Sequence, residues 1–86
     1  MSKIDELAEL ISGVTSKIDE ATNESGSAAQ QAEEVGSTAA ALGAENVVQG
    51  LAEVKTQLDA LTDLLKGAAE RADEIKALAL SVAENG

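Results

Sequence analysis

The chain has 86 residues and a formal net charge of −10, and it contains no cysteine, histidine, proline or aromatic residue. The missing cysteine excludes disulfides and thiolate chemistry, and the missing histidine removes the commonest general base and transition-metal ligand. The excess of 16 acidic over 6 basic residues opposes direct binding to nucleic acid. We therefore expect no enzymatic activity, no cofactor and no metal site.

A first helix is expected over residues 3–42. Apolar residues recur there at alternating spacings of three and four, from Ile4 to Leu42, with Ser25 as the one polar interruption. A sustained repeat of 3.5 residues is typical of a coiled coil. Asn, Gly and Ser within residues 22–27 often mark loops, so four short helices are the alternative. The unbroken phase of the repeat across this segment favours one continuous helix.

A turn is expected at residues 43–46, followed by a second helix over residues 45–84. Gly43 directly follows the last residue of the first repeat, a place where glycine commonly ends a helix. A second apolar repeat begins at Val47 and continues to Val82. Because a short connection makes two long helices antiparallel neighbours, the sequence predicts an all-α antiparallel two-helix hairpin that forms a single domain over residues 1–86.

The expected seam uses the a and d positions of a seven-residue repeat lettered a to g, with Ile4 and Leu51 at a and Leu7 and Val54 at d. In the matching antiparallel register, small residues of one helix face large residues of the other. Ser25 then faces Leu65, Ala39 faces Leu51, and Leu58 and Leu61 are buried against Ala32 and Ala28. Such size alternation fills a seam without voids.

Two edges flank this expected seam and are candidates for association with another protein. One edge is small and nearly uncharged, and it contains Ala8, Thr15, Ala29, Thr62 and Ala69. The other edge contains Leu10, Leu64 and Leu78, and Leu80 adds a further apolar side chain. Apolar residues beyond one seam suggest a second packing partner. We expect a homodimer that forms a four-helix bundle, or the equivalent pairing with a heterologous helical protein.

The acidic residues suggest no site of their own. Fifteen of the sixteen carboxylates fall at positions b, c or f, on the outer surface of the expected hairpin. Adjacent pairs such as Asp5 and Glu6 lie on a convex, solvated surface with no pocket behind them, which is unlike a catalytic pair. An acidic rod that mimics DNA and inhibits a basic protein is an alternative function. No apolar run is long enough to span a membrane and no signal-peptide core is present, so we expect a cytoplasmic protein.

The overall plan resembles the WXG superfamily of type VII secretion substrates, the ESAT-6-like helical hairpins. The resemblance lies in two helices of about 40 residues joined at a glycine turn, and it covers nearly the whole chain. In place of that family's Trp-x-Gly, the turn reads Leu42-Gly43-Ala44-Glu45-Asn46, and there is no tyrosine for its C-terminal signal. The resemblance implies an association with type VII secretion, but it assigns no functional residue.

Overall fold

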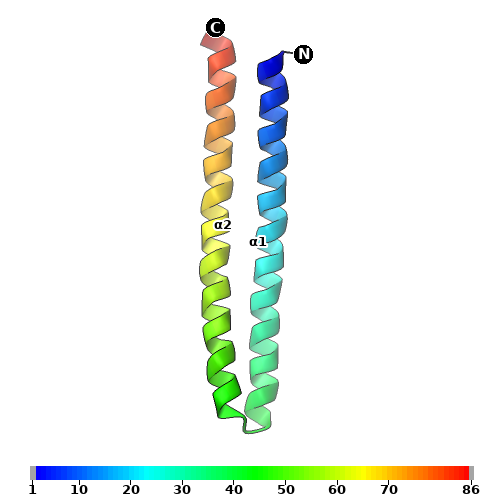
Figure 1. Ribbon diagram of the computed structural model, residues 1–86, viewed down its shortest axis with the longest axis vertical. Coiled ribbons are helices and arrows are strands. Elements are labelled where there is room, and N and C mark those ends of the chain that lie inside the picture. Colours follow the sequence, from blue (N-terminus) through cyan, green and yellow to red (C-terminus); the bar gives the residue numbers. More distant parts are fainter. Residues whose placement is uncertain (1, 86) are drawn as a thin grey trace.

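The computed structural model describes residues 2–85, which form two long antiparallel helices (Figure 1). Helix α1 comprises Lys3–Ala41 and α2 comprises Glu45–Asn85. The hairpin measures 65 × 16 × 10 Å between Cα positions, and its turn lies at the end opposite to both termini. The predicted all-α hairpin is therefore confirmed. Helix α1 continues without a break through residues 22–27, so the alternative of four short helices is wrong.

Local hydrogen bonds define the ends of α1. The Ser2 hydroxyl accepts a bond from the Asp5 backbone N–H, and the Asp5 carboxylate accepts one from the Ser2 N–H. This reciprocal capping box pairs backbone donors that the first helical turn would otherwise leave free. At the other end, the N–H groups of Gly43 and Ala44 donate to the carbonyl oxygens of Ala40 and Ala39. Gly43 has a φ of 73°, so it ends the helix in the left-handed conformation that its lack of a Cβ allows.

The seam between the helices uses positions a and e, which corrects the expected a/d seam. Every buried residue lies at one of these two positions, and most other a and e residues are half-buried. By contrast, Leu61, which was expected to be buried at d, is 45% exposed. The six buried residues are all small: Ala8, Ser25, Ala29, Ala32, Ala39 and Ala72.

Small residues at position e of α1 explain why the seam has rotated away from d. Position e carries alanine, threonine or glycine at every turn of α1, so the backbones can approach each other on that side. A Cβ placed on Gly36 would lie 3.8 Å from the Cβ of Leu51, an ordinary van der Waals distance. The register shifts accordingly, because Gly36 rather than Ala39 lies opposite Leu51. Ser25 is hydrogen-bonded to Thr62 rather than packed on Leu65.

Candidate association face

Nearly all of the large apolar side chains that the described residues expose to solvent lie on one side of the hairpin. All of the large hydrophobic residues that are exposed, apart from Leu80, fall at positions d and g. We call this surface the apolar face, and its members are Leu7, Leu10, Val14, Val35, Leu42, Val47, Val54, Leu61, Leu64, Ile75, Leu78 and Val82.

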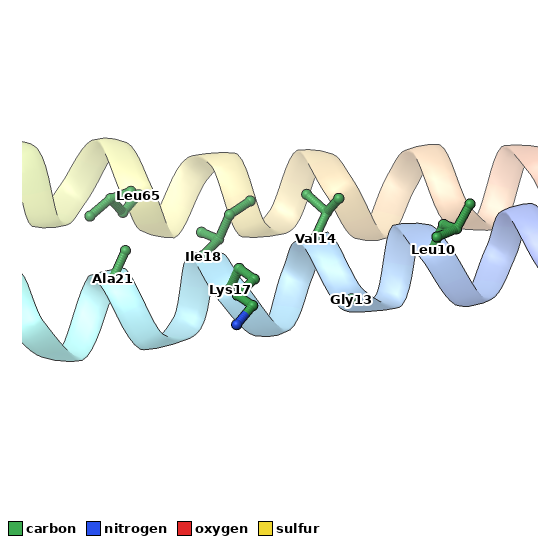
Figure 2. Close-up of a pocket in the computed structure, with 7 residues that line it drawn as sticks. All are labelled: Leu10, Gly13, Val14, Lys17, Ile18, Ala21 and Leu65. Atoms are coloured by element: carbon green, nitrogen blue, oxygen red, sulfur yellow. The ribbon is translucent and has the colours of Figure 1, made fainter.

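Helical geometry places these residues of both helices on the same side. Positions d and g lie next to each other on a helix and on one flank of the a/e seam. In an antiparallel pair, equivalent flanks of the two helices fall on the same side, so the two rows form one surface along the length of the hairpin. A groove of about 510 Å³ on this side joins Leu10, Val14 and Ala21 of α1 to Leu65 of α2 (Figure 2).

Charged side chains are scarce on the apolar face. Of the d and g positions, only Lys3, Lys17, Glu24 and Arg71 carry a charge. All sixteen carboxylates are exposed to solvent, and every one except Glu24 lies at b, c or f, on the other surfaces. Lys17 lines the groove, and its Nζ lies 3.8 Å from Oε2 of Glu20 on the next turn. The hairpin thus separates an apolar side with four charged residues from strongly acidic outer surfaces.

The predicted association residues divide into three groups in the structure. Leu10, Leu64 and Leu78 are 70%, 71% and 65% exposed and belong to the apolar face. Leu80 lies at position b, on the opposite flank of the seam. The five residues of the small edge do not form a free surface, because they lie within the seam between α1 and α2: Ala8, Thr15, Ala29, Thr62 and Ala69.

The sequence interpretation missed the d row as part of an exposed surface. Leu7, Val14, Val35 and their counterparts in α2 were assigned to a two-helix seam because of their regular spacing. The signal that could have placed them correctly is the run of small residues at position e of α1. The small residues at position e of α1, together with Ser25, Ala32 and Ala39 at position a, permit the close approach seen here and leave the larger d residues outside it.

No other functional site emerges from the part of the chain that the structure describes. Residues 2–85 contain no group of three or more acidic side chains arranged to hold a metal ion. Within the same residues, neither helix has a stretch that is apolar enough to cross a lipid bilayer. Comparisons with protein-family models, with curated proteins and with solved structures give no match to this chain.

Proposed function

We propose that the protein is a non-enzymatic interaction module that associates through its apolar face, pairing with a second copy to form a four-helix bundle. The observation that carries this proposal is the contrast between the two sides of each helix. The seam buries only small side chains, and no large side chain among the described residues is fully buried. Twelve large apolar residues are instead exposed together on the apolar face, and such a patch is typical of a protein–protein interface.

The angular spacing of the residues supports a four-helix bundle. At about 100° per residue, the midpoints of the a/e and d/g directions lie roughly 110° apart around each helix. A helix in a four-helix bundle contacts two neighbours at about this angle, and its a and d residues point between them toward the centre. The a/d repeat in the sequence is therefore explained by a bundle core, of which one hairpin supplies half.

The exposed area is consistent with a missing partner. The hairpin exposes 6140 Å², whereas a compact monomer of its mass exposes about 4,700 Å². The broad side of the molecule, 65 by 16 Å between Cα positions, has an area of about 1,000 Å². Two such surfaces would bury roughly 2,000 Å² in total, which lies in the range of obligate homodimers.

The charge distribution favours a second copy on this side only. Two hairpins of charge −10 repel each other, and the repulsion is strongest if their acidic outer surfaces meet. Contact through the apolar face keeps fifteen of the sixteen carboxylates of each copy outside the interface. Electrostatics thus restricts self-association to one face and opposes further stacking.

Sedimentation equilibrium at tens of micromolar tests the proposal. The wild-type chain is expected to sediment as a dimer of 8.7 kDa subunits. Combining Leu10→Glu with Leu78→Glu places charges on the apolar face and is expected to weaken the dimer. The matched control is Ala40→Glu with Ala60→Glu, at exposed positions outside the face. A well-folded wild-type monomer at these concentrations would contradict the proposal.

A further inference from the structure

The groove on the apolar face marks a gap in its packing surface. It is lined by Leu10, Gly13, Val14, Lys17, Ile18, Ala21 and Leu65 (Figure 2). The end of the groove nearer the turn is at Ala21, and at that level both d residues are alanines, Ala21 on α1 and Ala68 on α2. Ala21 and Ala68 lie at the same height along the hairpin, because two contacts between the helices fix their alignment on either side. The Thr15 hydroxyl donates to the Asp73 carboxylate on one side, and the hydroxyls of Ser25 and Thr62 are hydrogen-bonded on the other. Elsewhere on the face, at least one d residue at each level is valine, leucine or isoleucine.

We infer that Leu61 of a second copy packs over this pair of alanines and that the two hairpins stack with their turns at opposite ends. This inference rests on the proposed self-association and specifies its geometry. Two identical faces can pair with two-fold symmetry in two ways, either with the turns together or with the turns apart. The two arrangements place different residues over Ala21 and Ala68.

Packing favours the arrangement with the turns apart. With the turns together, Ala21 and Ala68 of one copy meet Ala68 and Ala21 of the other, so the two levels that lack a large d side chain coincide. An apolar void of this kind forfeits dispersion contacts and is destabilising. With the turns apart, the level of Ala21 and Ala68 meets the level of Ala28 and Leu61 in the second copy. Each pair of alanines then faces Leu61 of the other copy, a side chain that is 45% exposed in the single hairpin.

The charges near the groove favour the same arrangement. Lys17 follows Thr15 by two residues and Arg71 precedes Asp73 by two, so both cations lie at one level of the hairpin. With the turns together, two copies would bring four cations to that level. With the turns apart, Lys17 and Arg71 meet the level of Gln31 and Gln57. The two-fold axis then passes near Glu24 and Leu64, so each of these residues lies close to its own counterpart.

Single-cysteine variants distinguish the two arrangements, since the chain has no cysteine of its own. Sedimentation of each reduced variant first establishes that association is retained. Under mild oxidation, Leu64→Cys is expected to form a covalent dimer, whereas Leu78→Cys, equally accessible but far from the axis, is not. Disulfide formation between Leu10→Cys and Leu78→Cys chains, without cross-linking of Leu64→Cys, would overturn the arrangement but leave the proposed function intact. Monomeric sedimentation of every variant and of the wild type would instead refute the proposed function.

A charge variant provides a second measurement that does not depend on oxidation. With the turns apart, the two Glu24 carboxylates face each other, and Glu24→Gln is expected to tighten the dimer about two- to five-fold at low salt. The control is Glu34→Gln, which removes the same charge from position c, outside the face. Equal effects of the two substitutions would show that net charge alone is responsible and would count against the proposed axis.

Discussion

The side-chain oxygens of Ser25 and Thr62 lie 2.8 Å apart at the middle of the hairpin and join α1 to α2. Both hydroxyls also lie within hydrogen-bond distance of the Leu58 carbonyl oxygen, at 3.2 and 2.9 Å. One of the two hydroxyls can donate to the Leu58 carbonyl while the second hydroxyl donates to the oxygen of the first. Both hydroxyl protons then have an acceptor. The polar interruption of the first apolar repeat is thus a hydrogen-bonded layer, and it opposes sliding of one helix along the other.

A double-mutant cycle measures the strength of this layer. Combining Ser25→Ala with Thr62→Val is expected to reveal a coupling free energy of about 0.5–1.5 kcal/mol, because the hydroxyl pair is shielded from water. Urea denaturation followed by circular dichroism provides the four stabilities. The control is the same cycle with Thr56→Val in place of Thr62→Val, because Thr56 is exposed and bonds only to the Ala52 carbonyl of its own helix. A coupling indistinguishable from zero would mean that the two helices are not aligned at this pair.

The a/e seam makes a specific prediction about Ala29, which is 4% exposed. Ala29→Leu adds a large side chain where the helices approach closely, and it is expected to cost about 1–3 kcal/mol of stability through overpacking. Ala60→Leu is the matched control because Ala60 is exposed on the outer surface. Thermal melts of the two variants provide the comparison. If Ala29→Leu were as stable as the control, the seam would not include position e.

The fold follows from the sequence more directly than its packing does. Helix type, continuity, the glycine turn and antiparallel order all depend on local periodicity and on Gly43. All four were predicted, and the predicted ends of both helices lie within one residue of the observed ends. The choice between a/d and a/e seams depends instead on how closely two backbones approach. That distance is set by the small residues of both helices together, such as Ala29 of α1 and Ala72 of α2. For this reason the leucine edge was placed correctly, whereas the small edge was assigned to a free surface.

Leu58 and Leu61 provide a test that separates the hairpin seam from the apolar face. Leu58 lies half-buried in the seam, so Leu58→Ala is expected to destabilise the protein by about 2–5 kcal/mol at any concentration. Leu61 lies on the apolar face, and the cost of Leu61→Ala is expected to grow with protein concentration as the wild type dimerises. Melting curves recorded from one to several hundred micromolar show the difference. A concentration-independent loss for Leu61→Ala would place Leu61 in the seam, as the sequence first suggested.

The turn should tolerate less change at Gly43 than the helices do at their own glycines. Gly43→Ala forces a side chain into the left-handed conformation and is expected to cost about 1–2 kcal/mol. Gly50→Ala is the matched control, since a Cβ there meets no atom within 4 Å and the residue lies inside α2. That substitution is expected to stabilise the helix by about 0.5–1 kcal/mol. A denaturation midpoint that falls below the wild-type value for Gly43→Ala and rises above it for Gly50→Ala would confirm the assignment.

Lys55 makes a stabilising contact with Asp59 that is lost at strongly alkaline pH. Its Nζ lies 2.8 Å from Oδ2 of Asp59, and this hydrogen bond, together with the negative charges of Asp59 and Glu33, raises the pKa of Lys55 above its usual value of 10.5. A raised folded-state pKa means that the contact stabilises the protein fully below the pKa of the unfolded chain. The stabilisation is then lost as the pH rises through the folded-state value. Asp59→Asn is therefore expected to destabilise the hairpin at pH 7, and its deficit relative to wild type should shrink above pH 10.5.

Melting curves of both proteins between pH 7 and pH 11.5 test this, with NMR titration of the Lys55 ammonium group as a direct readout. Asp63→Asn serves as the control because it removes one carboxylate from α2 without touching Lys55. A deficit for Asp59→Asn that stays constant across this range would show that the loss does not arise from the Lys55 charge.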